Sequence, residues 1–384
     1  MTPKTIQVIM SPLMLLLIIL LSIFGLSNAQ PGCTTSVSQS NVTVHGSVNI
    51  NLDPLAPTDI NRLAALNRSV HQEWYFDSFS ADGTSDITIV FFHQSGSSNG
   101  DIYVMLDAIW PNGTRYNNNI FVEESHVITC PGQTTGLWSS SAQYISFNFI
   151  LDSNLKRAII TVKTPNINGE WHLDSTTPAR YPYGDLYPSR SASLYFAPYN
   201  WWEEAIPSGT VSTTFEFEGT KLSFDGFGGH DTFVTAFSPW NLISKDWIWA
   251  RLVAGPYSAV IWYYNSSIDA ELHVSAFLVQ GETILFSSPG PNSTFTLSLL
   301  YDGGVSDNVI NNATGFGFDF TQTSGQHNSW HFEMKHTHLG LQDYGTNSNY
   351  TRFVDTVSGG ESGGLLYDGS GQSEQVVFKH APLP

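Results

Sequence analysis

Basic side chains are scarce in this 384-residue chain. It holds 15 lysine and arginine residues against 33 aspartate and glutamate residues, which gives a formal net charge of −18 at pH 7. Such a surface repels phosphate backbones and anionic lipid head groups, so the composition argues against a nucleic-acid partner and against binding to an anionic membrane. Internal repeats with a fixed period of roughly 20 to 50 residues are also missing, which excludes a solenoid and disfavours a propeller.

Cysteine is almost absent, because Cys33 and Cys130 are the only two in the chain. In an oxidising compartment an even number is most simply explained by one disulfide, which would tie the start of the mature chain to the first domain. Closing so long a loop is worth roughly 4 to 5 kcal/mol in the chain-entropy model. The alternative is a pair of buried free thiols.

The N-terminus indicates which compartment the chain enters. Residues 1–29 combine a sparse positive region at Lys4, an apolar run over about 14–24 and a small-residue cleavage site at 27–29. This pattern is typical of a secretory signal peptide. A transmembrane anchor is the competing interpretation, but the apolar core is short, and no later segment approaches the roughly 20 residues that a span needs. We expect a secreted or lumenal protein of the secretory pathway with no membrane span after cleavage.

Potential glycosylation sites fit the same route. Seven Asn-x-Ser/Thr sequons lack proline in the middle position, and in a secreted chain such asparagines are expected to carry glycans on surface loops. They are Asn41, Asn67, Asn112, Asn265, Asn292, Asn312 and Asn349.

Helix signals are few, and strand signals dominate. The best helix candidate is TDINRLAALN, residues 58–67, with a cap at Thr58 or Asp59. By contrast TTFEFEGTKLSF, residues 213–224, alternates apolar and polar positions and predicts a hairpin that turns at Glu218-Gly219. Similar strand patterns occupy 87–92, 144–151, 158–162, 257–264, 272–279 and 294–301. This spacing of strands and turns predicts an all-β protein built from sandwiches or barrels.

The length of the mature chain predicts two domains. About 355 residues remain after the signal peptide, more than one hydrophobic core usually organises. The stretch 181–207 is rich in proline and aromatic residues, and fresh hairpins follow it, so we place the domain boundary near residue 205.

Standard catalytic signatures are missing. There is no His-Glu-x-x-His, no phosphate-binding loop and no glycine-rich dinucleotide fingerprint between a strand and a helix. Ser362 formally matches a nucleophile elbow, but it lies in the loose GGESGG run between expected strands, where an elbow needs a strand, a sharp turn and a helix. In their place the chain has 11 Trp, 16 Tyr and 24 Phe, which permit a deep apolar ligand pocket.

HQEWYFDSF, residues 71–79, is the first cluster that could carry chemistry. In a strand, Glu73, Tyr75 and Asp77 project from one face and Trp74 from the other. If the acidic face lines a cavity, one of its carboxyls could have a raised pKa and act as an acid or a hydrogen-bond donor. The alternative is that this face meets solvent, which the general behaviour of antiparallel strands favours.

FDGFGGHDTFVTAFSPW, residues 224–240, is the second cluster. Its glycines permit backbone angles or close approaches that other residues resist, and they deliver His230-Asp231 near a strand end. The pair is either a functional one or a turn in which Asp231 caps local backbone groups, and the residues alone leave both interpretations open.

HNSWHFEMKHTHLGL, residues 327–341, is the third cluster. Alternation puts Trp330 and His336 on one face and His331, Glu333 and Lys335 on the other, with His336 and His338 sharing a face. The two could supply two metal ligands, but no third ligand has a recognisable spacing, so we expect no metal.

Together, HQEWYFDSFS, GFGGHDTFVTAFSPW followed by WIWARLVAGPYSAVIWYY, and HFEMKHTHLGL resemble the fungal Diels–Alderase family of decalin-synthase-like pericyclases. That family is similar in turn to carotenoid 1,2-hydratase and AttH-like proteins with two lipocalin-like domains. The resemblance implies an N-terminal β-sandwich over 30–205, a C-terminal lipocalin-like β-barrel over 206–384 and a substrate cavity at their junction. It also implies a [4+2] cycloaddition of a polyene or polyketide-derived small molecule without a cofactor.

The resemblance also suggests roles for individual residues. It implies Glu73, Lys335 and Trp330 as catalytic residues, with protonated Glu73 or Lys335 donating to the dienophile's carbonyl. For His230 and Asp231 we expect architecture and pocket shaping more than proton transfer. The other residues that it implies in substrate binding are Trp74, Tyr75, Asp77, Trp240, Trp249, His331 and Glu333.

Two other functions compete with the cycloaddition. One is a hydratase or isomerase that uses Asp77 or Asp231 as a general acid on an isoprenoid. The related hydratases usually have a shorter His-Asp to Trp spacing that ends in Trp-Gly, whereas residues 238–241 read Ser-Pro-Trp-Asn, which disfavours hydratase chemistry. The other is a secreted carrier of an apolar ligand with no catalytic activity.

Overall fold

The computed structural model describes residues 32–379, apart from 95–98, 238–239, 289–292, 307–311, 324–327 and 345–347. The expected signal peptide and the sequon residue Asn292 lie outside these described residues. Within them, no helix is both long enough and apolar enough to cross a membrane.

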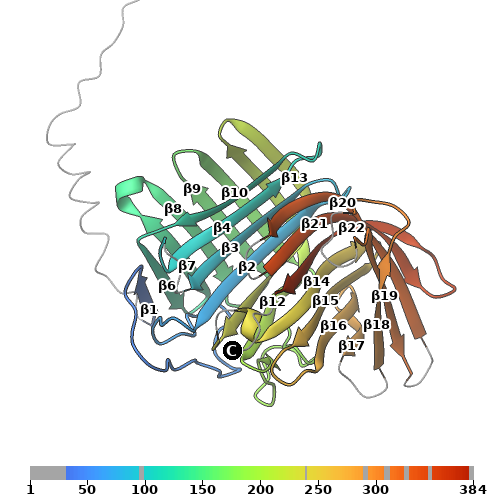
Figure 1. Cartoon of the computed structure of the whole chain (residues 1–384), viewed down its shortest axis with the longest axis horizontal. Coiled ribbons are helices and arrows are strands. Elements are labelled where there is room, and N and C mark those ends of the chain that lie inside the picture. The colour runs from blue at the N-terminus through green and yellow to red at the C-terminus, as the bar shows by residue number, and fades with distance from the viewer. Residues whose placement is uncertain are drawn as a thin grey trace, which may run out of the picture.

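Nearly every described element is a β-strand, which confirms the all-β prediction (Figure 1). The strands of the first half are β1 (Thr34–Gln39), β2 (His71–Ser80), β3 (Asp86–Gln94), β4 (Ile102–Ile109), β5 (Arg115–Phe121), β6 (Glu124–Cys130), β7 (Gln133–Ser140), β8 (Ile145–Asp152), β9 (Arg157–Lys163), β10 (Ile167–Ser175), β11 (Tyr195–Ala197), β12 (Asn200–Phe217) and β13 (Thr220–Thr235). Those of the second half are β14 (Ser244–Ala254), β15 (Tyr257–Ser266), β16 (Leu272–Gln280), β17 (Thr283–Ser288), β18 (Ser293–Leu300), β19 (Gly315–Gln322), β20 (Asn328–Tyr344), β21 (Ser348–Glu361) and β22 (Tyr367–Phe378). Two short 3-10 turns, η2 (Ser141–Gln143) and η3 (Trp240–Leu242), complete the described elements.

The first sheet has 13 strands and curls into a half-barrel. Its order is β1-β6-β7-β8-β9-β10-β12-β13-β2-β3-β4-β5, with β11 paired to β12. Because the sheet curls, aromatic side chains of β2 and β3 pack against those of β7 and β8. The ring of Phe91, for example, lies 5.1 Å from those of both Trp138 and Phe149. These contacts form a buried core of its own for the N-terminal half.

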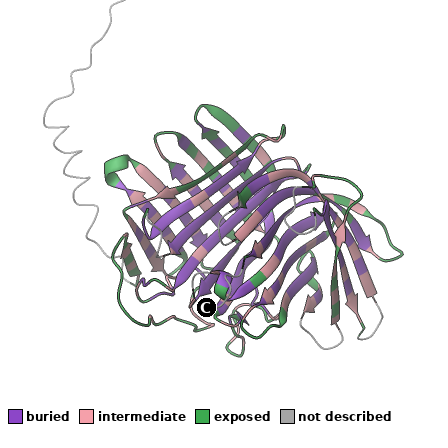
Figure 2. Ribbon diagram, viewed as in Figure 1, coloured by how far each residue is buried: buried purple, intermediate pink, exposed green. Residues whose placement is uncertain are grey.

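The second sheet has nine strands in the order β17-β16-β15-β14-β22-β21-β20-β19-β18 and is nearly closed into a barrel. Its end strands β17 and β18 are in contact. Inward-facing side chains such as Phe318, Phe332 and Met334 are fully buried and fill the barrel. Figure 2 shows the buried residues concentrated on the strands in the middle of the molecule, where the two sheets meet.

The strands and the hairpin turn that the sequence predicts are present in the structure. The hairpin of residues 213–224 is the end of β12 and the start of β13, with Phe217 opposite Thr220. Glu218 and Gly219 form the turn with φ of 48° and 84°, a left-handed conformation that glycine adopts readily and that suits a two-residue hairpin loop. The six other predicted strands all fall on observed strands.

The predicted helix over residues 58–67 is wrong. The segment is an irregular strap with one isolated bridge between Ile50 and Leu63. Its backbone groups form hydrogen bonds with side chains of β2. The Arg62 N–H donates to the Gln72 side chain at 2.9 Å, and the Asp59 carbonyl accepts from the Trp74 indole at 3.2 Å. Tertiary hydrogen bonds to β2 thus replace the local bonds of a helix.

The chain passes from the first sheet to the second between Thr235 and Ser244. The boundary expected near residue 205 falls inside β12, which runs unbroken in the first sheet from Asn200 to Phe217. The proline-rich stretch before β12 connects β10 to β12, and both of these strands belong to the first sheet.

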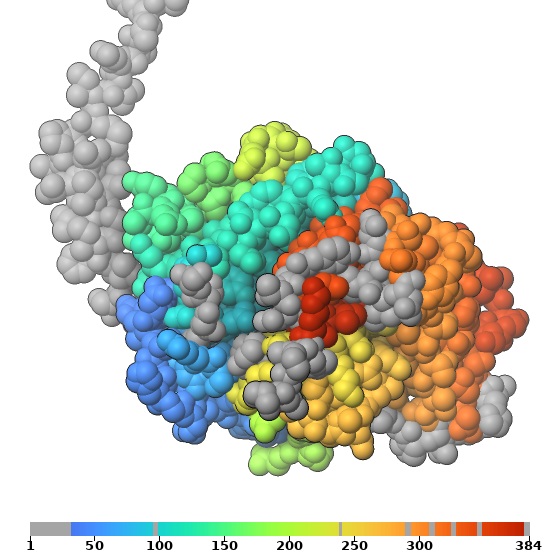
Figure 3. Space-filling model, viewed as in Figure 1, coloured from blue at the N-terminus to red at the C-terminus, as the bar shows by residue number. Residues whose placement is uncertain are grey.

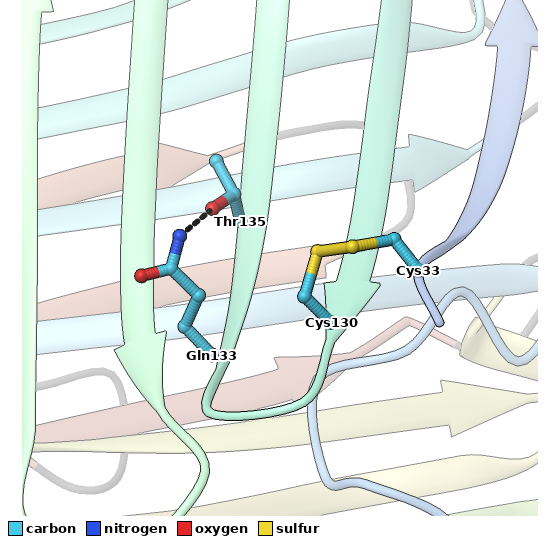
Figure 4. The surroundings of a disulfide bond; sticks show 4 residues. All are labelled: Cys33, Cys130, Gln133 and Thr135. Carbon is cyan, nitrogen blue, oxygen red and sulfur yellow. Dashed lines mark hydrogen bonds between the residues drawn. A yellow bond between two sulfur atoms is a disulfide. The ribbon is translucent and has the colours of Figure 1, made fainter. Parts of the chain in front are cut away.

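The predicted disulfide is confirmed. Cys33, just before β1, is bonded to Cys130, the last residue of β6, with an S–S distance of 2.08 Å (Figure 4). The bond lies where β1 and β6 pair, next to Thr34 opposite Thr129. It therefore fastens the first described strand to the edge of the sheet.

The sequon asparagines differ in exposure. Asn41, Asn112 and Asn312 are exposed. Asn67, in contrast, is buried, and its amide nitrogen donates to the Gly46 carbonyl at 2.7 Å. The burial of Asn67 disfavours a glycan there, and glycosylation of the sequons stays a prediction.

Candidate functional site

The site is built by strand alternation at the junction of the two sheets. On β14, Ile248, Ala250 and Leu252 face the inside of the barrel, whereas Trp249 and Arg251 face the first sheet. The outer face of β14, β15, β21 and β22 therefore packs on the face of β2, β3, β4, β12 and β13 that the N-terminal core does not use. Figure 3 shows the side on which residues of the first sheet, in teal, meet yellow and red residues of the barrel.

A cavity of about 310 Å³ lies in this junction. Aromatic and other apolar residues are 13 of the 21 that line it, and the polar side chains come from both sheets. The lining residues are His71, Glu73, Tyr75, Phe92, Gln94, Tyr103, Met105, Trp202, Asp231, Phe233, Trp240, Trp247, Trp249, Trp262, Asp343, Ser348, Tyr350, Arg352, Glu374, Val376 and Phe378.

The acidic face of β2 points into this junction, so the expectation that it meets solvent is wrong. His71, Glu73 and Tyr75 line the cavity, and His71 Nε2 lies 3.1 Å from Glu73 Oε2. Trp74 occupies the opposite face, in the N-terminal core, which separates it from the cavity because alternate residues of a strand project to opposite sides. Asp77 is fully buried farther along the interface.

One polar wall is a hydrogen-bonded network centred on Glu374. Tyr75 Oη donates to its Oε1 at 2.5 Å, and Arg352 donates from Nε at 2.9 Å and from Nη2 at 2.8 Å. Arg352 also donates to Asp107 and Tyr350. Burial raises the phenol pKa of Tyr75 well above its ordinary value, so this hydroxyl keeps its proton. Because the network is internally satisfied, it fixes the wall in place.

A second polar wall contains Asp231. Its Oδ2 accepts from Arg251 Nη2 at 3.2 Å, while Arg251 also donates to Asp77 and lies 3.8 Å from Glu204. Arg180 also donates to Glu204, so two guanidinium groups face three buried carboxyls. Burial raises the pKa of Asp231 well above its ordinary value, and the neighbouring Glu204 charge raises it further. Asp231 therefore holds its proton to a higher pH than an exposed aspartate does.

Five tryptophans shape the apolar part of the cavity: Trp202, Trp240, Trp247, Trp249 and Trp262. Four of these rings contact one another, with centroid distances of 5.1 Å for Trp240–Trp247 and for Trp202–Trp262, while the Trp249 ring lies 5.4 Å from that of Tyr75. Trp240 and Trp249 were expected at the substrate, and both line the cavity; their role in binding stays a prediction. Such interlocked rings hold their positions and can impose a shape on a flexible ligand.

His230 and Asp231 project from opposite faces of β13. His230 is fully buried outside the cavity lining, where Nδ1 lies 2.9 Å from the Tyr75 carbonyl and Nε2 lies 2.5 Å from Asp59 Oδ1. Its ring stacks on Phe76 with centroids 3.7 Å apart. His230 therefore ties the N-terminal strap to β2 and β13 and makes no direct contribution to the lining, in contrast to the expected binding role.

Replacing His230 by alanine is expected to destabilise the fold by about 2 to 4 kcal/mol, because it leaves a cavity and removes the partner of the buried Asp59 Oδ1. The measurements are the yield of soluble protein, the midpoint of urea unfolding and the isomer ratio of the product. We expect a low yield and an unchanged isomer ratio. Normal yield with complete loss of turnover would contradict this role.

The structure does not bring the late-strand candidates to the cavity. Trp330 is buried inside the barrel. Lys335 lies on the outer surface, where its Nζ is 3.0 Å from Asp302 and 3.5 Å from Glu333, and His331 bonds Asp319 at 2.7 Å. The alternation predicted for β20 holds as far as His336, but this half of the strand pairs with β19, away from the junction. The catalytic roles implied for Lys335 and Trp330 therefore have no support in the geometry.

His336 and His338 have separate partners. His336 is buried with Nδ1 2.6 Å from Asp355, while His338 Nε2 lies 3.1 Å from the Pro111 carbonyl, and a bulge in the β20–β21 pairing falls between them. Across the described ranges, no three His, Cys, Asp or Glu side chains are grouped so as to hold a metal ion.

Polar contacts also cross the junction beyond the cavity. Gln372 Nε2 on β22 donates to Asp86 Oδ2 at 2.9 Å and to Thr88 Oγ1 at 2.6 Å on β3. Burial raises the pKa of Asp86 to about 7, because a charged carboxylate is poorly solvated there.

Asp86 makes the junction sensitive to pH. Between the ordinary carboxyl pKa of 3.8 and about 7, the native state binds more protons than the unfolded chain, so stability falls as pH rises through this window. We expect a loss of about 2 to 4 kcal/mol from this group. Urea unfolding at pH 5 and pH 8 checks it: Asp86→Asn should be less sensitive to pH than the wild type. Equal pH dependence of the two proteins would contradict the assignment.

Two β-sheets that enclose an aromatic cavity with a few polar groups define a protein built to hold a small apolar molecule. The chain belongs to the Diels-Alderase-like family, which matches residues 30–379. It is 30% identical over 336 residues to the Diels-Alderase cheD of Chaetomium globosum, covering 85% of this chain and 78% of that protein. It is 28% identical to the Diels-Alderase poxQ of Penicillium oxalicum over 82% of this chain and 71% of the relative.

The solved structure of CghA has the same fold. It superposes with a TM-score of 0.75 at 20% identity and covers 91% of this chain and 100% of its own. At that identity the likeness concerns the fold alone.

Proposed function

We propose that this protein is a pericyclase of the Diels–Alderase type that binds a linear, polyene-bearing intermediate of secondary metabolism and closes it by a [4+2] cycloaddition. The observation that carries the proposal is the aromatic cavity between the two sheets. Membership of the Diels-Alderase-like family supports it. Such a reaction forms two carbon–carbon bonds within one bound molecule and needs no nucleophile.

The cavity can supply what a cycloaddition needs, which is a folded substrate. Rings from both sheets surround the space, and these include Phe92 and Phe233 from the first sheet and Trp249 and Trp262 from the second. A flexible chain confined between them is held with diene and dienophile in contact. Preorganisation of this kind is worth up to roughly 7 to 11 kcal/mol of the barrier.

Asp231 is the group best placed to add electrostatic catalysis. Its raised pKa favours the protonated, donating form of a carboxyl that lines the cavity. A hydrogen bond from it to the carbonyl of the dienophile would withdraw electron density and strengthen as charge develops in the transition state. Glu73, the donor expected from the sequence, also lines the cavity, and its Oε2 lies 3.1 Å from His71 Nε2.

Deletion of the gene in its native host tests the proposal. A cycloaddition conserves mass, so we expect the extract to lose a cyclic product and to accumulate a linear isomer, or its uncatalysed diastereomers, at the same mass. An unchanged profile would contradict the proposal and favour a carrier of an apolar ligand. The expected signal peptide is a separate prediction, and locating the mature protein in a secretory compartment tests it.

A proton on Asp231 also favours one second candidate, a hydratase or isomerase that uses this carboxyl as a general acid. An accumulating intermediate lighter than the product by one water would indicate the hydratase. A strict dependence of turnover on one acid, with no rescue by a neutral hydrogen-bond donor, would favour proton transfer over hydrogen bonding.

A further inference from the structure

We infer that Glu204 and Asp231 form a carboxyl pair that shares one proton at the wall of the cavity. Glu204 lies on β12 and is the positioning residue, whereas Asp231 lies on β13 and is the member that lines the cavity. The inference deepens the proposed function and rests on it in one respect, namely that the molecule held in the cavity meets Asp231.

The first observation is that the two carboxyls are direct neighbours across two strands. Glu204 is paired with Asp231 in the register of β12 and β13. Residues opposite each other in an antiparallel pair have Cβ atoms roughly 4.5 to 5.5 Å apart, and like charges in such a pair are destabilising. Both side chains project toward the second sheet, since Nη2 of Arg251 lies 3.2 Å from Asp231 Oδ2 and 3.8 Å from Glu204 Oε1. The two acidic groups therefore meet at one nitrogen atom.

The second observation is an imbalance of buried charge. The carboxyls of Asp77, Glu204 and Asp231 face two guanidinium groups, those of Arg180 and Arg251. None of the five residues is more than 4% exposed. If all of them were ionised, three negative charges would face two positive charges, and a surplus buried charge is costly. One bound proton makes the cluster neutral.

The third observation is a buried acceptor without a donor. Glu204 Oε2 accepts from Arg180 Nε, but Glu204 Oε1 has no hydrogen-bond donor among the described residues. Buried polar atoms in folded proteins are normally hydrogen-bonded. A protonated Asp231 can donate to this oxygen, whereas an ionised Asp231 can only accept. The shared proton therefore removes the surplus charge and satisfies the acceptor at the same time.

The proton resides mainly on Asp231, because Arg180 stabilises the charge of Glu204. Burial raises the pKa of both carboxyls. The Arg180 charge lowers the pKa of Glu204, while the Glu204 charge raises that of Asp231 further. The other groups that act on the pKa of Asp231 are Glu73 of β2 and Glu374 of β22, which raise it, and the hydrogen-bonded indole of Trp202, which lowers it.

Glu204 acts through Asp231, since Glu204 is not among the residues that line the cavity. Two carboxyls that share a proton titrate as one unit, and each depends on the charge of the other. Removing the Glu204 charge relieves the repulsion that retains the proton, so Asp231 alone would ionise at a lower pH. Glu204 thus sets the pH below which the cavity wall carries this proton.

Glu204→Gln tests the inference, because it keeps the size of the side chain and removes its charge. The matched control is Asp355→Asn, which neutralises a carboxyl that is also buried but bonds to His336 and Ser373. The intact protein, labelled with ¹³C at the aspartate side-chain carboxyls, is titrated by NMR without any added ligand. The signal absent from Asp231→Asn is that of Asp231.

We expect the Asp231 signal of the wild type to titrate at a higher pH than the signals of exposed aspartates. In Glu204→Gln the curve should move to lower pH, and in Asp355→Asn it should coincide with that of the wild type. An Asp231 curve that Glu204→Gln leaves unchanged, or that Asp355→Asn moves by as much, would overturn the inference.

Asp77→Asn is a second variant, which decides the question if Glu204→Gln does not fold. It leaves two carboxyls for two guanidinium groups, so the cluster is neutral without a proton. Asp231 should again titrate at a lower pH than in the wild type, and an unchanged curve would contradict the count of charges. These titrations need no substrate and do not depend on whether the gene deletion removes a cyclic product, so the two proposals can fail separately.

Discussion

Replacing Asp231 by leucine is expected to lower turnover by roughly 100- to 1,000-fold, the usual cost of removing one preorganised donor from a reacting oxygen. The side chains are similar in size, so the cavity keeps its shape while the proton is lost. The linear compound that accumulates in the deletion strain serves as the substrate, and the rate is measured as cyclised product formed per unit time. The uncatalysed reaction of the same compound is the baseline.

Asp231→Asn is the matched control, because its amide still donates a hydrogen bond but does not titrate. The wild-type carboxyl donates only below its raised pKa, so turnover should fall as pH rises through that value. The amide variant should keep most of the activity and lose this pH dependence. Activity of Asp231→Leu near the wild-type level would exclude Asp231 as the donor.

Replacing Arg251 by methionine is expected to destabilise the protein by about 3 to 5 kcal/mol, because it leaves buried carboxyls without their partner. Arg251 is fully buried, pairs with Asp77 of the other sheet and donates a hydrogen bond to Asp231. Unfolding in urea measures the loss. We expect the two halves of the molecule to separate more readily as well, which proteolysis between β13 and β14 would detect.

Two controls separate this effect from a general loss of charge. Lys156→Met removes an exposed partner of Glu282 and should cost less than about 1 kcal/mol. The double variant Arg251→Met with Asp77→Leu removes one of the stranded charges and should recover part of the loss. A loss in Arg251→Met no larger than that in Lys156→Met would show that the buried ion pairs do not hold the junction.

The sequence predicts this fold well where the signal is local. Alternation along 71–79, 213–224 and 327–341 predicts the strands and their two faces, and the turn at Glu218-Gly219 follows from residue type. The strap at 58–67 has a helical pattern, but it bonds to Gln72 and Trp74, whose position depends on how the sheet curls. Contacts of that kind are set by tertiary structure, which local propensity does not contain.

The site could be predicted in part for the same reason. The face of Glu73 and Tyr75 and the adjoining Asp231 were visible as chemistry-bearing groups, and they do line the cavity. Sequence reasoning missed Arg352 and Glu374, because each lies in an ordinary strand pattern. They reach the cavity network only because β21 and β22 pack on β2 and β4, where they meet Tyr75 and Asp107. In WIWARL, alternation alone would have placed Arg251 beside Trp249, facing the opposite way from the barrel core.

Three of the hydrophobic clusters among the described residues are separate: one fills the curled sheet, one fills the barrel, and a third, which includes Phe233, Trp249 and Trp262, borders the cavity. Substitutions in the third cluster leave the interior of each domain intact. The rings that determine ligand shape are therefore a different set from the rings that fill each domain. A protein arranged in this way can change its substrate faster than its architecture.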